Sequence, residues 1–559
     1  MSTPNESDWD VVVVGAGAAG LATALFAAIG GLRVLVLEQS PWIGGTSALA
    51  AGALWIPNTH HAQGSGDTPQ RAAAYLNAAV GEGSPAALRE AFLRLGPEAA
   101  AQLERESAVQ LRAFAHHPDY LGELPGASTW GRVLECPPFD GRLLREDLAR
   151  LRPPIPEFTV LGGMMVDRSD IGHLLGMGRS VASMRHAAGL IARHALDRLR
   201  HPRGTRLVMG NALIGRLLFS LRERGVPVWT RTSTTQLIDD AGRVTGVRAS
   251  SDGRSLALRA HRGVVMAGGG FNDHAAWRAS WLPLQVRHSP RAGTSQGALL
   301  DEALRLGARL DQRPGGSACW APVSVHPRRD GSTAVFPHFV LDRAKPGTLV
   351  VNSRGERFLD ESSSYHLFGE RLLAQGADPA WLIADALAVR RYGLGLVRPG
   401  ARGLARLVRE GHLVQAPTLD ALAMRLQLPP SALTSSVARF NALARAGADG
   451  DFGRGSTAYQ RNLGDPAVSP NPTLRPLSEA PFYAVRLHPA DIAGSRGLRC
   501  DEHARVLGPQ GPIMGLYAVG NDMQSVMGAS YPGPGINLGP AVVFAYAAAK
   551  ALRSNQEFL

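Results

Sequence analysis

The stretch "DVVVVGAGAAGLATALFAAIGGLRVLVLE", residues 10–38, decides the fold. Its four consecutive valines predict a buried strand at Val11–Val14, the apolar run that follows predicts a helix at Ala18–Ile29, and a second strand is predicted at Val34–Leu37. Strand, helix and strand in this order form a βαβ unit with parallel strands. The chain is therefore predicted to be an α/β protein with a Rossmann-like domain.

The turn between the first strand and the helix has the spacing G-x-G-x-x-G. In this pattern the first glycine makes a tight turn, the second lets a pyrophosphate approach the backbone, and the third packs the helix on the strand. The phosphate rests on the positive N-terminus of the helix, and an acid ending the second strand accepts a hydrogen bond from a ribose hydroxyl. The predicted dinucleotide-binding residues here are Gly15, Gly17, Ala18, Ala19, Gly20 and Glu38.

The composition, with 45% hydrophobic and 19% charged residues, is that of a globular protein, and 559 residues predict two or three lobes. The three cysteines, Cys136, Cys319 and Cys500, are far apart, which predicts neither a disulfide framework nor a clustered metal site. The N-terminal segment MSTPNESDWD lacks the basic start of a secretory signal. Residues 11–32 are uncharged, but their glycine-interrupted strand–turn–helix pattern argues against a membrane span. We therefore predict a cytoplasmic protein without a metal.

The net charge of +12 comes from arginine, since only two lysines occur. Residues 171–231 hold eleven arginines and two acids, so most of the surplus lies there. This region lacks the interleaved aromatic residues of a nucleic-acid-binding surface, and no nucleic-acid partner is predicted.

Two further segments resemble the fumarate-reductase-like flavoproteins. Residues 44–47, GGTS, match a turn that in those proteins runs under the flavin, and residues 515–522, GLYAVGND, match a strand whose end reaches the ribityl chain. The resemblance implies FAD rather than NAD, bound non-covalently because the histidine of covalent members is missing from the turn. It adds as FAD-binding residues Gly44, Gly45, Thr46, Ser47, Gly520, Asn521 and Asp522, with Gly268 at the end of another predicted strand.

Between the two ends, short alternating runs in residues 226–266 predict strands that complete a glutathione-reductase-like FAD-binding domain. Residues 419–427 and 432–447 predict helices of a separate, inserted α+β cap domain. The substrate is expected where the cap meets the flavin. The predicted domains are the first part of the FAD-binding domain at 1–310 with an insert at about 160–210, the catalytic cap at 311–479, and the second part of the FAD-binding domain at 480–559.

The chain resembles the bacterial 3-ketosteroid Δ1-dehydrogenases over most of its length. The matching stretches are GGTSALAAGALWIP, HHPDYLGELPG, NSRGERFLDESSSYHLFG, PFYAVRLHPADIAGSRGLRCDEHARVL and ASYPGPGINLGPAVVFAYAAA. The most specific is the Tyr-Pro-Gly-Pro-Gly motif at residues 531–535. The resemblance implies an FAD-dependent oxidoreductase of CH–CH bonds that converts 3-keto-4-ene steroids into 1,4-diene-3-ones in steroid degradation.

In that family the tyrosine and the last glycine amide of the motif hold the steroid C3 carbonyl, which assigns this role to Tyr531 and Gly535. Two fixed donors of this kind form an oxyanion hole. The resemblance also assigns removal of the C2 proton to Tyr365 and support of that base to Tyr120, while hydride leaves C1 for flavin N5. Because the ordinary pKa of tyrosine is about 10, the assignment requires a neighbouring hydroxyl and an apolar cleft. The helix after the motif adds to the cofactor-binding residues Gly535, Asn537 and Leu538.

The insert departs from the shorter members of that family. Its apolar residues Leu190, Ile191 and Leu196, interleaved with Arg193, Arg198 and Arg200, predict a basic amphipathic helix. Two interpretations are open: peripheral contact with the inner face of the cytoplasmic membrane, or a solvated helix that covers the FAD-binding domain. A comparable insert in family members that accept long-side-chain sterones points to substrates such as cholest-4-en-3-one.

Three other functions remain open. A fumarate-reductase-like enzyme acting on a dicarboxylate would need cationic groups, yet the stretch PGPGINLG has no arginine; another enone is a further possibility. A 3-ketosteroid Δ4-(5α)-dehydrogenase places its catalytic tyrosine and serine differently. A membrane-associated flavoprotein without turnover would not need the four site residues. No second nicotinamide-binding fingerprint occurs, so a quinone or another oxidant is expected to accept the electrons.

Overall fold

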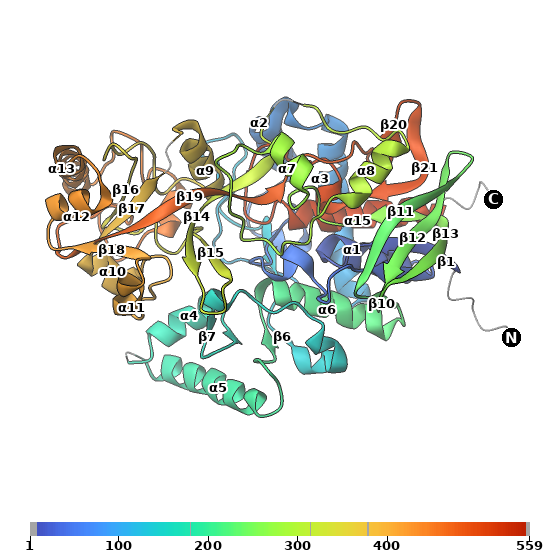
Figure 1. Ribbon diagram of the computed structural model, residues 1–559, viewed down its shortest axis with the longest axis horizontal. Coiled ribbons are helices and arrows are strands. Elements are labelled where there is room, and N and C mark those ends of the chain that lie inside the picture. Colours follow the sequence, from blue (N-terminus) through green and yellow to red (C-terminus); the bar gives the residue numbers. More distant parts are fainter. Residues whose placement is uncertain (1–7, 179, 314, 377–378, 555–559) are drawn as a thin grey trace.

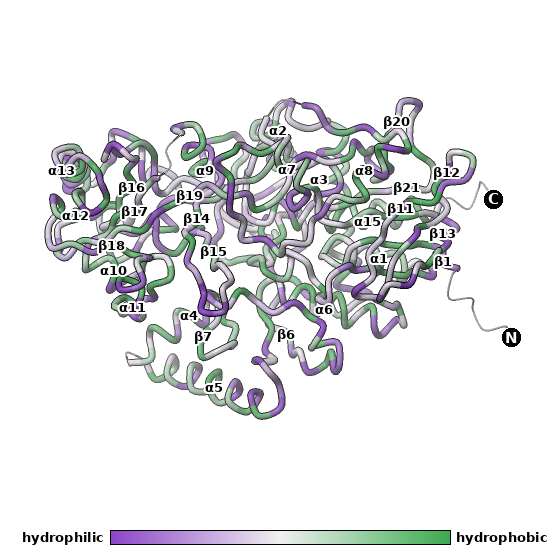
Figure 2. Tube along the Cα trace, in the orientation of Figure 1, coloured by the Kyte–Doolittle hydropathy of each residue, from purple (hydrophilic) through white to green (hydrophobic). Residues whose placement is uncertain are grey.

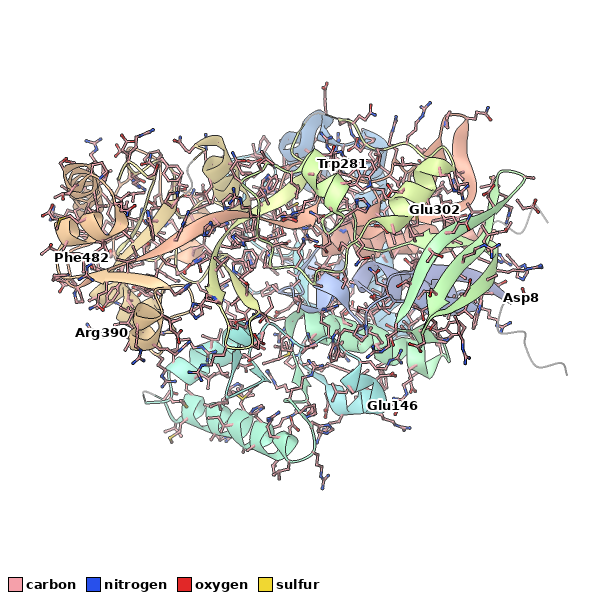
Figure 3. All side chains as sticks on the ribbon, viewed as in Figure 1. Asp8, Glu146, Trp281, Glu302, Arg390 and Phe482 are labelled. Carbon is pink, nitrogen blue, oxygen red and sulfur yellow. The ribbon has the colours of Figure 1, made fainter. Side chains whose placement is uncertain are left out.

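The computed structural model describes residues 8–178, 180–313, 315–376 and 379–554, and its chain is built around two β-sheets (Figure 1). Residues 1–7, which carry most of the segment used to predict the absence of a secretory signal, lie outside the described residues. The two sheets occupy opposite ends of the molecule, with Asp8 near one end and Phe482 at the other (Figure 3).

The first sheet contains the predicted βαβ unit. Strand β1 spans Asp8–Val14, helix α1 spans Ala18–Ile29 and β2 spans Val34–Leu37, so only the start of the first strand differs from the prediction. The strand order is β10-β2-β1-β13-β12-β21-β20, with β11 paired to β12, and β1 pairs in parallel with both β2 and β13. The prediction of an α/β, Rossmann-like fold is confirmed. The other strands are β10 (Val228–Trp229), β11 (Thr232–Asp240), β12 (Arg243–Ser251), β13 (Arg254–Met266), β20 (Arg505–Gly508) and β21 (Gly511–Ala518).

Small side chains let α1 lie close against this sheet. Its residues from Ala18 to Ala27 are buried, and it packs against α15 (Leu538–Ser554) and α6 (Met209–Glu223). Beneath it, Val11, Val12 and Val13 are fully buried, each contributing about 1.5–3 kcal/mol through the hydrophobic effect. This rigid core holds the turn at residues 15–17 in place.

The second sheet has the order β15-β14-β19-β17-β16, with β18 on β19, and all of its pairs are antiparallel. The sequence analysis placed the strand after residue 480 in the FAD-binding domain, but β19 pairs with β14, β17 and β18 and therefore lies in the second sheet. The chain returns to the first sheet at β20. The domain division itself stays a prediction. The elements are β14 (Ala318–Pro327), β15 (Thr333–Pro337), β16 (Thr348–Val351), β17 (Ala380–Asp385), β18 (Leu413–Ala416), β19 (Phe482–Gly494), α9 (Tyr365–Ala374), α10 (Ala386–Tyr392), α11 (Leu404–Arg409), α12 (Leu419–Leu426) and α13 (Pro430–Ala446).

A small sheet, β3-β5-β4, comes between β2 and β10 of the first sheet in the chain, and η2 (His60–Ala62) follows its first strand. The remaining elements used below are β3 (Leu54–Trp55), α2 (Pro69–Val80), α3 (Ala86–Glu106), β4 (Arg112–Ala113), β5 (Val133–Glu135) and α14 (Ala458–Leu463).

The insert forms a helical hairpin of α4 (Arg168–Leu175) and α5 (Val181–Arg198) at the edge of the molecule (Figure 1). The inner face of α5 buries Ala187, His194 and Asp197, and the Asp197 carboxylate accepts hydrogen bonds from the backbone and side chain of Thr205. In the described part of the chain, every helix is too short or too polar to cross a membrane.

Hydrophobic and hydrophilic residues alternate along α5 (Figure 2). Arg193, predicted for the basic face, instead points to the body of the protein and pairs with Asp140 at 3.1 Å. Arg185, Arg198 and Arg200 are exposed. Half of the exposed large hydrophobic residues among those described belong to the insert at about 160–210: Leu161, Leu175, Met177, Val181, Met184, Ile191, Leu196 and Leu199.

Candidate active site

The first glycine turn has the strained backbone that its sequence predicts. Gly15 has φ +114°, and a Cβ atom there would lie 2.1 Å from the carbonyl oxygen of Ala267. A Cβ atom on Gly20 would lie 1.9 Å from the carbonyl oxygen of Gly15. Gly17 differs, because the nearest atom to its Cβ position is the Ser47 hydroxyl at 3.7 Å. The first and third glycines thus serve packing, while the second leaves room at the helix N-terminus.

Glu38 closes this turn from the second strand. Its buried carboxylate accepts hydrogen bonds from the backbone N–H groups of Ala16 at 3.0 Å and Ser40 at 2.9 Å. Two amide contacts fix the carboxylate beside the glycine turn and leave lone pairs for a ribose hydroxyl. This arrangement fits the ribose contact of a dinucleotide.

The second glycine turn lies directly against the first, and the N–H of Gly44 donates to the carbonyl of Ala16 at 2.9 Å. Gly44 and Gly45 have φ +116° and +49°, and the nearest atom to a Cβ on Gly45 is the Cα of Gly17 at 3.8 Å. The Ser47 hydroxyl accepts a hydrogen bond from Ala18 N–H at 3.2 Å, and Thr46 accepts one from the N–H of Ala292. The side chain of Ala19, one residue into α1, is buried. Backbone N–H groups at the start of α1 and in glycine turns of this kind suit a phosphate chain that lies beside them.

The C-terminal residues predicted for FAD lie against the same helix. A Cβ on Gly520, which has φ +63°, would lie 2.9 Å from the Cβ of Ala19. The Asp522 carboxylate accepts hydrogen bonds from the N–H groups of Gly268 at 2.5 Å and Gly270 at 2.7 Å, and burial raises its pKa to about 6. Asp522 therefore fastens the end of β13 to the C-terminal strand. A pocket beside it is lined by residues that include Gly520, Asn521 and Asn537, and Leu538 begins α15 next to it.

The Tyr-Pro-Gly-Pro-Gly turn lies on β3. Gly535 has φ +90°, a Cβ there would lie 2.5 Å from the backbone of Ala53, and its carbonyl accepts hydrogen bonds from the N–H groups of Trp55 and Gly539. Within the described residues, the Gly535 N–H donates to no backbone carbonyl. Close packing thus fixes the position of this amide donor.

The Tyr120 loop is tied to this turn. The N–H of Tyr120 donates to the carbonyl of Pro532 at 2.8 Å. Its neighbour Asp119 accepts hydrogen bonds from the Trp55 indole at 2.9 Å and from the Arg132 guanidinium at 2.7 Å, and all three side chains are buried. Replacing one partner of such a buried pair is strongly destabilising, so this network holds Tyr120 firmly.

Tyr365 begins α9, whose N-cap is Ser364. Just before it, the carbonyls of Glu361 and Ser363 each accept a hydrogen bond of 2.6 Å from Nη1 of Arg343. Nε of Arg343 donates to two further carbonyls, and no carboxylate pairs with this fully buried guanidinium among the described residues. Arg343 therefore positions Tyr365 and leaves an uncompensated positive charge nearby.

Four tyrosine rings, from residues 120, 365, 459 and 531, form one buried group that we call the tyrosine cluster. The ring of Tyr365 lies 5.1 Å from that of Tyr531 and 5.6 Å from that of Tyr120. Tyr459, from α14, lies 4.4 Å from Tyr120. Tyr459 was not predicted from the sequence, since "STAYQRN" carries no motif and only the fold brings this residue to the others.

Burial raises the pKa of every tyrosine in the cluster, because a phenolate is poorly solvated there. The nearby charge of Arg343 lowers the pKa of Tyr120 and of Tyr459 against this trend. The Tyr459 hydroxyl and Nη2 of Arg343 are both buried and have no hydrogen-bond partner among the described residues.

A pocket of about 270 Å³ opens beside Tyr531 and is lined by Leu121, His366, Leu367, Glu370, Ala529, Ser530 and Tyr531. The His366 ring lies 5.7 Å from that of Tyr531, accepts a hydrogen bond from the N–H of Trp320, and pairs with Glu370 at 3.3 Å. His366 is buried and lines this pocket.

Residues 10–538 match the family model described as FAD binding domain. The chain is 36% identical to the 3-oxosteroid 1-dehydrogenase of Mycolicibacterium smegmatis, with 97% of this chain and 96% of the relative covered. It is also 36% identical to the 4-oxocyclohex-2-ene-1-carboxylate 5-dehydrogenase of Sinomonas cyclohexanicum, with 97% and 93% covered. The crystal structure of 3-ketosteroid delta1-dehydrogenase from Sterolibacterium denitrificans in complex with 1,4-androstadiene-3,17-dione matches with a TM-score of 0.90 and 33% identity, over 98% of this chain and 100% of that one.

These matches cover nearly the whole chain and agree with the two glycine turns, which fit FAD. The chain belongs to the FAD-binding flavoprotein family and, within it, to the 3-ketosteroid Δ1-dehydrogenase family of FAD-dependent oxidoreductases.

Proposed function

We propose that this enzyme removes the C1 and C2 hydrogens of a 3-ketosteroid, turning a 3-keto-4-ene into a 1,4-diene-3-one. The observation that carries the proposal is the Gly535 N–H, which donates to no backbone carbonyl within the described residues. It lies in the turn that begins with Tyr531, whose ring stands 5.1 Å from that of Tyr365. Two donors and a base in one buried site are what removal of a proton next to a carbonyl requires.

The two donors polarise the substrate carbonyl. The Tyr531 hydroxyl and the Gly535 N–H are proposed to donate to the C3 oxygen, where negative charge develops as the C2–H bond weakens. Because both are fixed before substrate arrives, they stabilise that charge without reorganising, which is worth roughly 10²–10³ in rate per donor.

Tyr365 is proposed to remove the C2 proton. Burial and the neighbouring tyrosines raise the pKa of its hydroxyl well above the ordinary value, so an isolated Tyr365 would be a poor base. Tyr120 lies against it, and Arg343 lowers the pKa of Tyr120 and of Tyr459. We infer that the proton is shared along Tyr365, Tyr120 and Tyr459 toward this cation.

The FAD-binding residues are proposed to be those of the two glycine turns, Glu38, Gly268, the segment 520–522 and the start of α15. Bound there, without a covalent link, FAD supplies the oxidant that accepts hydride from C1. The proposed electron acceptor is a quinone or another oxidant.

The substrate is proposed to be a neutral steroid rather than an oxocyclohexanecarboxylate, although a relative named for such a ring is equally similar. Leu121, Leu367 and Ala529 give the pocket an apolar wall, and none of its lining residues is arginine or lysine. Glu370 stands at the mouth with its side chain 43% exposed and would repel a carboxylate.

Anaerobic visible spectroscopy of the purified enzyme tests this function. Androst-4-ene-3,17-dione and cholest-4-en-3-one are expected to bleach the oxidised-flavin band and yield a 1,4-diene-3-one, the faster of them revealing the preferred side chain. A flavin band that only 4-oxocyclohex-2-ene-1-carboxylate bleaches would contradict the steroid proposal. In that case Glu370→Gln should raise the rate on the carboxylate.

We also propose that the outer face of α5 rests on an anionic membrane surface from the cytoplasmic side. The support is the concentration of exposed apolar side chains on the hairpin, next to the exposed Arg185, Arg198 and Arg200. A sterol-like substrate dissolves in lipid, so contact with the membrane would shorten its path to the pocket.

Co-sedimentation with phosphatidylcholine vesicles, with and without phosphatidylglycerol, tests this contact. Serine at Met184, Leu196 and Leu199 together should abolish binding to the anionic vesicles. Leu284→Ser is the matched control, because Leu284 is 85% exposed and lies away from the hairpin. If the wild-type protein, the triple serine variant and Leu284→Ser bind the anionic vesicles equally, the interpretation of α5 as a solvated helix would be favoured.

A further inference from the structure

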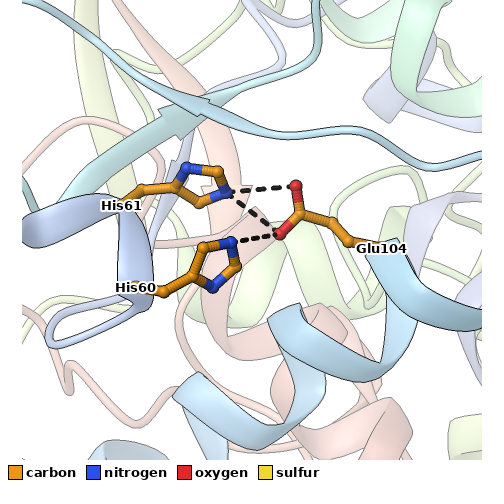
Figure 4. Close-up of side chains that lie close together, drawn as sticks. All are labelled: His60, His61 and Glu104. Carbon is orange, nitrogen blue, oxygen red and sulfur yellow. Dashed lines mark hydrogen bonds and ion pairs between the residues drawn. The ribbon is translucent and has the colours of Figure 1, made fainter.

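Two histidines and a glutamate form a cluster that the proposed reaction does not use, which we call the His–His–Glu cluster (Figure 4). His60 and His61 begin η2, and Glu104 lies near the end of α3. No metal site was predicted from the sequence, because the three cysteines are far apart. The fold instead brings together two other ligand types from separate elements.

The distances within the cluster suit a shared cation. The Nε2 atom of His60 lies 3.1 Å from Oε2 of Glu104, and that of His61 lies 3.0 Å from Oε2 and 3.1 Å from Oε1. Zinc binds histidine nitrogen and carboxylate oxygen at about 2.0–2.2 Å, which places neighbouring ligand atoms roughly 3.0–3.5 Å apart. Both imidazoles therefore point their Nε2 atoms at the volume where one ion would bind.

The carboxylate is held from behind. Oε1 of Glu104 accepts a hydrogen bond of 3.0 Å from the N–H of Leu111, which fixes the orientation of the group. Supporting contacts of this kind keep a ligand in the geometry that a metal requires. The outer side is open, since the His60 side chain is 57% exposed, so water can complete the coordination.

We propose that the His–His–Glu cluster is a binding site for one divalent transition-metal ion, best matched by Zn²⁺, with His60 Nε2, His61 Nε2 and Glu104 as its protein ligands. Imidazole and carboxylate favour zinc and copper over magnesium or calcium, which prefer oxygen ligands alone. Binding needs both Nε2 atoms unprotonated, so each histidine carries its remaining proton on Nδ1.

The proposed ion stabilises the fold and takes no part in the reaction. It ties η2 to α3 and, through Leu111, to the segment that leads into the Tyr120 loop. Five residues before His60, Trp55 supports both Gly535 and Asp119. A ligand that binds only the folded state raises the free energy of unfolding, so bound zinc should raise the melting temperature.

Zinc titration of the chelator-treated full-length holoenzyme tests the proposal by calorimetry and thermal melting. We expect one ion per chain and a higher melting temperature, with affinity lowered on the order of tenfold or more in Glu104→Gln and in His60→Asn. Glutamine keeps an acceptor for the Leu111 N–H, and His60 is exposed, so both variants should fold. His503→Asn is the matched control, because His503 forms an exposed pair with Glu502 at 3.6 Å elsewhere.

Electron paramagnetic resonance of Cu²⁺ added to the same protein identifies the ligands. The wild-type spectrum should show coupling to two imidazole nitrogens, and His60→Asn should show one. Zinc binding that is unchanged in Glu104→Gln and His60→Asn, or no binding at all, would overturn the proposal, and the cluster would be a hydrogen-bonded pair of histidines on a carboxylate.

Discussion

The glycine turns proposed to bind FAD and the tyrosine cluster are built in different ways. The first two turns lie within residues 15–47, and backbone sterics fix them: Gly15 and Gly20 have no space for a side chain. The tyrosine cluster gathers residues 120, 365, 459 and 531 from four separate segments, with ring centres 4.4–5.8 Å apart. The turns are rigid through short-range geometry, whereas the cluster depends on long-range anchors such as Asp119 and Arg343.

Because of this difference, we expect a substitution in the glycine turns to have the largest effect on cofactor binding and folding. In Gly20→Val the new side chain would meet the Gly15 carbonyl, with Cβ at 1.9 Å, so α1 cannot pack on β1. We expect loss of bound FAD and of cooperative unfolding, measured by flavin absorbance per chain and by circular dichroism. Gly189→Ala is the control, since Gly189 lies in α5 with no atom within 4 Å of its Cβ position. A Gly20→Val protein that keeps FAD would show that the turn tolerates a displaced helix.

In the cluster, Tyr365→Phe should separate chemistry from folding. Removing the proposed base should lower kcat by about 10²–10⁴ while the flavin spectrum stays unchanged. The control is Tyr392→Phe, whose hydroxyl contacts Asp465 outside the cluster. Anaerobic flavin reduction at a near wild-type rate in Tyr365→Phe would assign proton removal to another group.

The same difference explains what could be predicted from sequence. The strands and helix around Gly15 were predictable because a periodic pattern and a G-x-G-x-x-G turn are local signals. The roles of Tyr120, Tyr365 and Tyr531 were assigned through resemblance alone, since no pattern near any of them indicates catalysis. Tyr459 and Arg343 were missed because no local motif marks them: Tyr459 meets Tyr120 from a distant segment, and Arg343 binds the carbonyl of Ser363, 20 residues along the chain. The strand β19 was misplaced because a strand's sequence does not say which sheet it joins.

Substitution of Arg343 should have a smaller effect, a shift in the pH dependence of kcat/KM whose direction can be checked. The charge of Arg343 lowers the pKa of Tyr120 and Tyr459, so Arg343→Gln should raise both. Proton removal needs an ionised base, so the rising limb of kcat/KM against pH should move to higher pH. The shift should be one pH unit for every tenfold decrease in the acid dissociation constant of the base. Arg343→Lys keeps the positive charge and should return the rising limb most of the way to its wild-type pH. Arg343 also binds the carbonyls before Tyr365, but a loosened α9 would lower the rate at every pH without moving the limb.

Tyr459→Phe should have the smallest effect and tests whether the cluster needs its fourth hydroxyl. That hydroxyl is fully buried without a hydrogen-bond partner among the described residues. Its removal should therefore leave the free energy of unfolding unchanged or raise it by about 1 kcal/mol, and the melting temperature should stay the same or rise accordingly. If the hydroxyl carries the proton from Tyr120 toward Arg343, kcat should fall by roughly tenfold, less than for the base itself. A more stable protein with unchanged kcat would end the proton path at Tyr120 and leave Tyr459 as packing. A slower but equally stable or more stable enzyme would show that an unpaired hydroxyl is kept here for the reaction at a cost in stability.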